Sequence, residues 1–313
     1  MSALLDVILP VFLVIGGRLC AGRGRGHRDR RCRRRADALC PEHCRARACC
    51  SRSIGRLDLG ANYDLGLFIS FYSGAFAGFG LGFLGARLLG RPATDAVAIG
   101  FAAMFSNSLL LGVPITERAY GTEALTGNFA IISIHSPLLY TAGILAMELA
   151  RSHGQGLPVR QLAWQVIRAI VTQPMVLGIA AGLAINLSGV PLPGFVWDAM
   201  KIIAGAAIPA ALFGLGGVLL RYKPEGDGRA IAVVVALSLV AHPLITWALG
   251  TQVFGLDTAQ LRSAVLTGAM APGVNGYLFA NSYGVAKRVA ASSVLIATLL
   301  SIGSIWFWLH ILP

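Results

Sequence analysis

The sequence predicts an all-α membrane protein, built as an inverted repeat of two five-helix halves. The first observation is composition: 56% of the 313 residues are hydrophobic, 13% are charged, and the mean hydropathy is +0.69. Such a chain is too apolar and too poor in charge for a soluble domain of this size. The second observation is a set of apolar stretches of membrane-spanning length. The third is that motifs in one half of the chain have counterparts in the other.

A transmembrane helix needs roughly 20 apolar residues. Eight stretches meet this length. A further pair of helices is expected at the N-terminus, where the sequence is anomalous, so the complete fold would have ten helices, of which about eight are intact in this sequence. The eight stretches lie at about 65–87, 95–116, 126–147, 164–187, 197–220, 230–252, 261–282 and 289–311.

The chain is expected to divide into five parts. The first transmembrane helix starts in 1–16, and an anomalous segment follows at 17–51. The remainder of the first repeat is expected at 52–150, a cytoplasmic loop at 151–162, and the second five-helix repeat at 163–313.

The anomalous segment is rich in arginine and cysteine. Residues 17–52 contain 12 Arg and three acidic residues, a net charge of +9, and all six cysteines. A disulfide framework is typical of small secreted domains and does not suit a polytopic membrane protein. The irregular spacing of the cysteines disfavours a metal site. A polybasic patch for lipid or nucleic acid would not explain the six cysteines.

Arginine codons read out of frame encode Ala, Val, Gly, Asp or Glu, and a shifted reading of residues 42–50 allows NIAVPALLF. That string matches GAAIPAALF at 205–213 in five positions. We therefore expect residues 17–51 to be an out-of-frame segment, with a real basic loop as the alternative.

Internal similarity also links the intact parts of the two halves. LLLGVPITERAYG (109–121) parallels GVNGYLFANSYGV (273–285). Because each half has an odd number of helices, the second must be inserted upside down. With the N-terminus outside, the positive-inside rule is satisfied. The cytoplasmic side then holds Arg87, Arg91, Arg151, Arg160, Arg168, Arg221, Lys223, Arg229, Lys287 and Arg288, and the other side Arg56, Arg118, Lys201 and Arg262.

Two spans are interrupted at corresponding places, by SNSLLLGVP (106–114) and MAPGVNG (270–276). A Gly or Pro interruption frees backbone amides and carbonyls that need a ligand, water or another helix. The half-helix N-termini carry partial positive charge, which suits a carboxylate. The predicted substrate-binding residues are Asn107, Gly112, Pro114, Pro272 and Asn275. The alternative is a pair of packing kinks.

His135 and His242 lie well within spans, each just before a proline. A membrane-embedded histidine can titrate and couple protons, or can serve as a hydrogen-bonded packing residue. The sequence contains no acidic pair, catalytic triad, phosphate loop or metal cluster. We therefore expect no enzyme activity, no cofactor and no metal.

NSLLLGVPI followed by YG, MAPGVNGYLFANSYG, AIPAALF and the reframed NIAVPALLF resemble the auxin efflux carrier family, whose bacterial members are often called malonate transporters. The resemblance covers roughly residues 53–313 and the first 16. It implies a secondary active transporter of small organic anions, either malonate-like dicarboxylates or auxin-like carboxylates. Alternating access would work around the crossed fourth and ninth helices of a multi-pass protein in the inner (plasma) membrane.

The implied partners are a small organic anion, a coupling ion that is either a proton or sodium, and the lipid bilayer. A homodimer is compatible with the sequence, and no nucleic-acid partner is expected. One alternative is a membrane channel or sensor, which would require a continuous polar pore lining or an appended soluble domain. Another is a non-functional frameshifted product.

Overall fold

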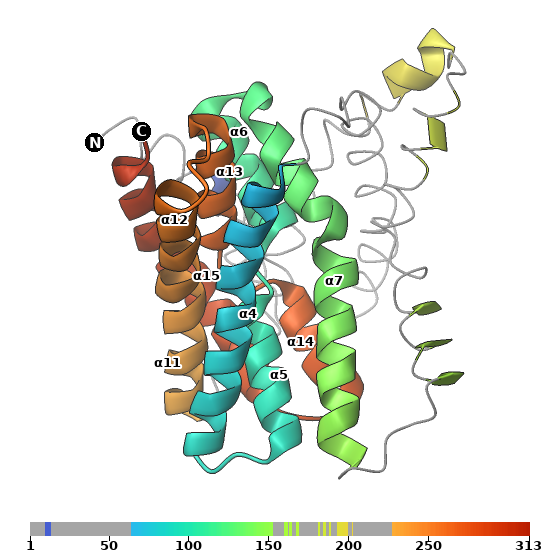
Figure 1. Cartoon of the computed structure of the whole chain (residues 1–313), viewed down its shortest axis with the longest axis vertical. Helices are drawn as coiled ribbons and strands as arrows, with labels where there is room; N and C mark the ends of the chain where they lie inside the picture. The colour runs from blue at the N-terminus through green and yellow to red at the C-terminus, as the bar shows by residue number, and fades with distance from the viewer. Residues whose placement is uncertain are drawn as a thin grey trace, which may run out of the picture.

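The computed structural model describes residues 10–13, 64–152 and 227–313, together with short pieces between residues 160 and 202. The predicted out-of-frame segment at 17–51 lies outside the described residues, as do most of the spans predicted at 164–187 and 197–220. In the described parts the chain forms helices that pack side by side into a bundle (Figure 1).

The long helices of the bundle are α4 (Leu65–Leu88), α7 (Leu125–Ser152) and α15 (Lys287–Ile311). A fourth continuous rod consists of α11 (Gly228–Ala236), the π-helix η3 (Leu237–Ala241) and α12 (His242–Gln252). Each of the four is long and apolar enough to cross a membrane. The predicted spans at 65–87, 126–147, 230–252 and 289–311 are therefore confirmed, and the protein is a multi-pass helical membrane protein.

In the parts of the chain that the structure describes, three helices begin at an aspartate that caps the first turn. Asp64 accepts a hydrogen bond from the Gly66 amide at 2.7 Å, and Asp227 accepts one from the Arg229 amide at 3.0 Å. Asp257 does the same for the Gln260 amide at 2.8 Å, at the start of α13 (Thr258–Gly268). An N-cap carboxylate satisfies a free amide and complements the helix dipole, so these local sequences fix where the helices start.

The two remaining predicted spans, 95–116 and 261–282, are interrupted as expected. In the first, α5 (Ala93–Met104) is followed by a short extended stretch, the π-helix η1 (Ser108–Gly112) and α6 (Val113–Tyr120). In the second, α13 ends at Gly268 and α14 (Val274–Tyr283) begins five residues later. Each described block thus has the same order: a long helix, a broken helix and a second long helix.

Both π-helices end two residues before a proline, Pro114 after η1 and Pro243 after η3. A proline inside a helix lacks an amide proton and its ring crowds the carbonyl four residues earlier. A wider π turn relieves this conflict without ending the helix. The prolines therefore favour these two π turns, although Pro137 is accommodated inside α7 without one.

Glycines allow the helices of the bundle to approach closely. A Cβ on Gly100 of α5 would lie 2.6 Å from the Phe79 carbonyl oxygen of α4, and one on Gly276 of α14 would lie 3.1 Å from the Cα of Ala102. Small residues at helix contacts are a usual device for packing in membranes. Consequently α5 is held between α4 and α14, which positions the break that follows it (Figure 1).

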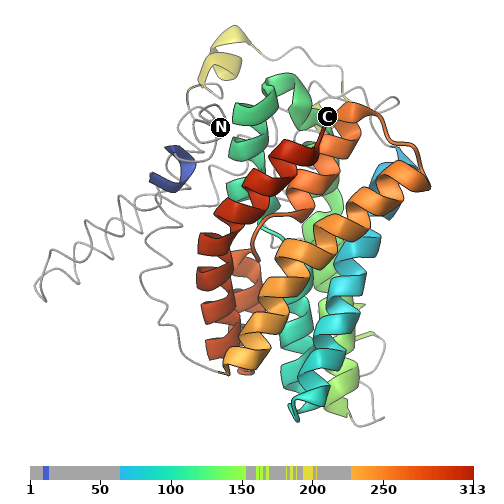
Figure 2. The same cartoon turned by 90° about the vertical axis from the view of Figure 1, so that its left-hand side faces the viewer.

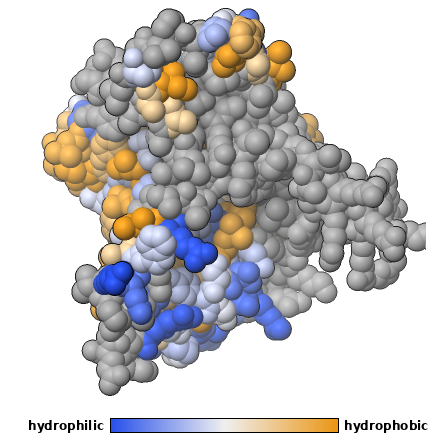
Figure 3. All heavy atoms as spheres, turned by 90° about the vertical axis from the view of Figure 1, so that its right-hand side faces the viewer, coloured by the Kyte–Doolittle hydropathy of each residue, from blue (hydrophilic) through white to orange (hydrophobic). Residues whose placement is uncertain are grey.

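One end of the bundle is basic. The α4–α5 turn, the end of α7 and the starts of α11 and α15 meet there (Figure 2), and they carry Arg87, Arg91, Arg151, Arg229, Lys287 and Arg288. Toward this end, the lower one in Figure 3, lie most of the strongly hydrophilic residues of the face shown. The grouping supports the predicted cytoplasmic orientation of this end.

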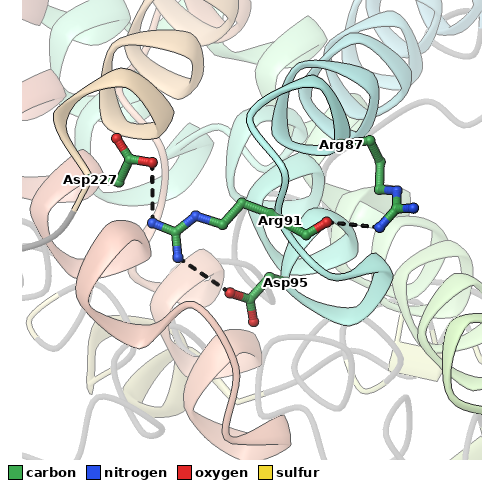
Figure 4. Close-up of polar contacts among 4 residues, drawn as sticks. All are labelled: Arg87, Arg91, Asp95 and Asp227. Atoms are coloured by element: carbon green, nitrogen blue, oxygen red, sulfur yellow. Dashed lines mark hydrogen bonds and ion pairs between the residues drawn. The ribbon is translucent and has the colours of Figure 1, made fainter.

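An ion-pair cluster ties the two described blocks together at this basic end (Figure 4). The Arg91 guanidinium lies 3.2 Å from the Asp227 carboxylate and 3.6 Å from that of Asp95, and Arg87 donates to the Arg91 carbonyl at 2.8 Å. The hydrogen bond from the Arg229 amide, with the nearby Arg91, lowers the pKa of Asp227 below its ordinary value. Asp227 therefore stays ionised and links the start of α11 to the α4–α5 turn.

Candidate functional site

The two helix breaks pair with each other. The backbone N–H of Asn107 donates to the Ala271 carbonyl at 2.8 Å, and the backbone N–H of Gly273 donates to the Phe105 carbonyl at 2.7 Å. Ser106 and Pro272 face each other in an isolated antiparallel bridge. The breaks therefore satisfy some of each other's freed backbone groups, as buried backbone in a membrane protein must.

The residue types at the bridge fit this geometry. The two hydrogen bonds flank Ser106 and Pro272, which makes them the non-hydrogen-bonded pair of an antiparallel bridge, so Pro272 gives up no bond by lacking an amide proton. A Cβ on Gly273 would lie 3.4 Å from the Phe105 ring and 3.5 Å from the Ser106 carbonyl oxygen. A methyl group at position 273 would therefore make ordinary van der Waals contact with the first break.

Asn107 is buried at the start of η1, with 6% of its surface exposed. Its Oδ1 accepts a hydrogen bond from the Leu110 amide at 3.3 Å, while its Nδ2 has no hydrogen-bond partner. The bond to Leu110 fixes which end of the amide is the oxygen, so Asn107 presents a buried, unused N–H donor beside the bridge. Gly112 and Pro114 are buried next along the same segment.

Asn275 occupies the first turn of α14 and is half-buried. Its Oδ1 accepts a hydrogen bond from the Tyr140 hydroxyl of α7 at 3.3 Å. The Tyr140 ring packs edge-on against Phe101, Phe105 and Phe279. The aromatic cluster thus holds Tyr140 in place, and Tyr140 in turn orients the Asn275 amide so that its oxygen is engaged.

The two predicted histidines meet around one side chain. The Phe71 ring of α4 lies 5.7 Å from the His135 ring and 4.8 Å from the His242 ring, measured between centroids. His242 bonds the Phe71 carbonyl through Nε2 at 3.2 Å. His135 is 2% exposed and lies 4.7 Å from the Phe105 ring at the first break. Of the two, His135 is the one next to the bridge.

Four residues near the breaks were missed from the sequence: Tyr140, Asn128, Thr116 and Thr267. The Asn128 Nδ2 of α7 donates to the hydroxyl oxygens of Thr116 of α6, at 3.3 Å, and Thr267 of α13, at 2.8 Å. All three of these residues are fully buried. The available signal was an isolated polar residue in an apolar stretch, as in TGNFAII, but only packing shows that the three meet.

Among the described residues, no group of three His, Cys, Asp or Glu side chains is placed to hold a metal ion. The polar groups gathered at the breaks are amides, hydroxyls, backbone groups and imidazoles.

Apolar spans with two interrupted helices paired inside the bundle are typical of multi-pass membrane transport proteins. The sequence model of the family described as "Membrane transport protein" matches residues 62–309. The chain belongs to this membrane transport family.

Individual relatives agree with that assignment. The chain is 25% identical to the "Putative malonate transporter" of Rhizobium meliloti over 229 residues, which are 73% of this chain and 71% of that protein. It is 25% identical to "Auxin efflux carrier component 5" of Arabidopsis thaliana over 231 residues, 63% of this chain and 65% of the plant protein. An "Uncharacterized transporter" of Methanothermobacter thermautotrophicus is 24% identical over 82% of both chains. The resemblance to auxin efflux carriers is thereby confirmed.

Proposed function

We propose that this transporter is a secondary carrier of small organic anions, with malonate-like dicarboxylates as the favoured class, and that the anion binds at the paired breaks. The observation that carries the proposal is the buried, unused Nδ2 donor of Asn107 beside the Ser106–Pro272 bridge. A buried donor without a partner costs about 1–3 kcal/mol, which a carboxylate oxygen would recover. The name of the Rhizobium relative supports the same substrate class.

Helix polarity favours an anion at this place. The π-helix η1 leads into α6 just after Asn107, and α14 starts just after Gly273, so two half-helix N-termini begin at the bridge. The helix dipoles place partial positive charge at these N-termini, which attracts a carboxylate. A dicarboxylate has two such groups, one for each N-terminus, with Asn107 serving one and Asn275 the other.

We also propose that the two described blocks belong to an inverted repeat. The shared order of long and broken helices in the two blocks supports it, and so does the antiparallel direction of the bridge. Because the breaks are joined by two backbone hydrogen bonds, they form a compact unit around which access can alternate between the two sides.

Of the two histidines, His135 is the one placed to couple a proton to the anion. His242 already bonds a backbone carbonyl and packs against Gly74, whose Cβ position lies 2.6 Å from the imidazole Cδ2. His135 lies against Phe105, next to the anion site. An anion bound there would stabilise a protonated imidazole, so proton and anion would bind together.

The test is uptake of radiolabelled malonate into vesicles that contain the full chain, alongside monocarboxylates and longer dicarboxylates. We expect saturable uptake that Asn107→Ala and Asn275→Ala each reduce roughly 5- to 150-fold, the loss that follows when a buried polar group is left without its partner. Asn281→Ala is the matched control, because Asn281 is exposed at the far end of α14. Undiminished uptake by the Asn107/Asn275 double variant would place the site elsewhere.

A further inference from the structure

A second polar site lies beside the anion site and is built from three helices. Asn128 of α7 reaches Thr116 of α6 and Thr267 of α13 through its amide nitrogen, at 3.3 and 2.8 Å. None of the three has measurable exposure. A Cβ on Gly112 would lie 4.0 Å from Asn128 Nδ2 and 3.8 Å from the Asn107 carbonyl oxygen, so the cluster adjoins the first break.

The first helix break and the three-helix cluster differ in which polar atom lacks a hydrogen-bond partner. At the break, Asn107 has an unused donor, its Nδ2. In the three-helix cluster, Asn128 has an unused acceptor, because its Nδ2 serves both threonines while its Oδ1 has no partner. An unused donor suits an anion, whereas a buried unused acceptor suits a positively charged ligand.

The C-terminal end of α13, next to the cluster, also favours a positively charged ligand. Thr267 is the penultimate residue of α13, which ends at Gly268. The carbonyls of a last helical turn carry partial negative charge, and in transporters such half-helix C-termini hold cations while N-termini hold the anion. Amide and hydroxyl oxygens are hard ligands that suit alkali and alkaline-earth ions rather than transition metals.

The net charge of the cluster limits the ligand to a single positive charge. Asn128, Thr116 and Thr267 are all neutral, and each further unit of charge buried among apolar helices costs several kcal/mol. We propose that these three residues bind a small monovalent cation, for which sodium is the probe. This site is separate from the proposed anion site, and it depends on that proposal only for the expectation that cation and anion strengthen each other's binding.

The first experiment measures binding without transport. The purified full chain is heated in buffers of equal ionic strength that contain sodium, potassium or choline chloride. We expect sodium to raise the unfolding midpoint in a saturable way, because a ligand that binds the folded state stabilises it. A midpoint that is the same in sodium and choline would overturn the proposal.

Variants locate the effect. Thr267→Val and Asn128→Leu should weaken the sodium response, by roughly 5- to 150-fold in affinity. Thr298→Val is the control, since that hydroxyl is equally buried but bonds the Val294 carbonyl within its own helix at 2.6 Å. Asn128→Asp should keep or tighten sodium binding, because it adds negative charge, and it also covers the case in which Asn128→Leu does not fold. A sodium response retained in both Thr267→Val and Asn128→Leu would contradict the assignment.

The second experiment separates this inference from the proposed function. Malonate binding is measured in sodium and in choline, and tighter binding in sodium supports coupling between the two sites. If sodium stabilises the chain through Asn128 but malonate binds in neither buffer, the anion proposal fails and the cation site stands. If malonate binds equally well in both buffers and sodium has no effect on stability, the cation site is wrong and the anion proposal stands.

Discussion

Ser106 and Pro272 face each other as the non-hydrogen-bonded pair of an antiparallel bridge between the two broken helices. The flanking bonds, from Asn107 to Ala271 and from Gly273 to Phe105, fix the distance between the two helix starts. Asn107 and Asn275 owe their relative placement to this pairing. The site therefore depends on contacts between segments that are remote in sequence.

Asn107 has two separable roles. Its Oδ1 caps Leu110, while its Nδ2 is the proposed contact to the substrate. Asn107→Asp keeps the capping oxygen and replaces the donor with a negative charge, so we expect strongly weakened malonate uptake and, because a buried charge is costly, a lower unfolding temperature. Asn107→Ala should lose stability as well, by about 1 kcal/mol for the missing cap. Uptake by the Asp variant that equals the unmodified chain would show that the donor does not contact the substrate.

Tyr140 is expected to position Asn275. Tyr140→Phe removes the hydroxyl that bonds the Asn275 Oδ1 and retains the ring among Phe101, Phe105 and Phe279. We predict a several-fold rise in the malonate concentration needed for half-maximal uptake, with the maximal rate little changed, because a hydrogen bond contributes about 0.5–1.5 kcal/mol. A fall in maximal rate alone would assign Tyr140 to the transport cycle instead.

The two histidines should behave differently when each is replaced by glutamine. His135→Gln removes the group that would bind a proton beside the anion site, so the dependence of uptake on pH should flatten. His242→Gln should leave the pH profile unchanged and lower the unfolding temperature, since His242 bonds Phe71 and packs between helices. Identical pH profiles for both variants and the unmodified chain would exclude coupling through His135.

Helix contact at Gly100 can be tested against a matched glycine. A Cβ on Gly100 would collide with the Phe79 carbonyl at 2.6 Å, whereas one on Gly80 of α4 meets nothing within 4 Å. Gly100→Ala should therefore destabilise the protein, by about 1–3 kcal/mol for overpacking. Gly80→Ala should be neutral or stabilising by up to about 1 kcal/mol. The comparison is made by thermal unfolding, and equal effects would argue against a close α4–α5 contact.

The basic end of the bundle should face the cytoplasm. A reporter inserted in the 151–162 loop, after α7, is expected to show cytoplasmic activity, and one inserted between α6 and α7 near Gly121 should show periplasmic activity. The reason is the gathering of Arg87, Arg91, Arg151, Arg229, Lys287 and Arg288 at that end. Reversed signals from the two reporters would invert the assignment.

The sequence by itself determined the class of the protein, the position of its described spans and the place of both helix breaks. These features are local: hydropathy over about 20 residues marks a span. Gly and Pro mark an interruption, and aspartates mark helix starts. The residues of the breaks, SNSLLLGVP and MAPGVNG, could be named for the same reason.

The tertiary structure alone decided which groups meet. Nothing in the chain near Ser106 specifies Pro272 as its partner, and nothing near His135 specifies that His242 shares the Phe71 ring. The cluster of Asn128, Thr116 and Thr267 joins three helices, and its polar atoms have meaning only once those helices are packed. The physical reason is that helix formation depends on nearby residues, whereas the register between packed helices is set by close contacts across the whole bundle, such as those of Gly100 and Gly276.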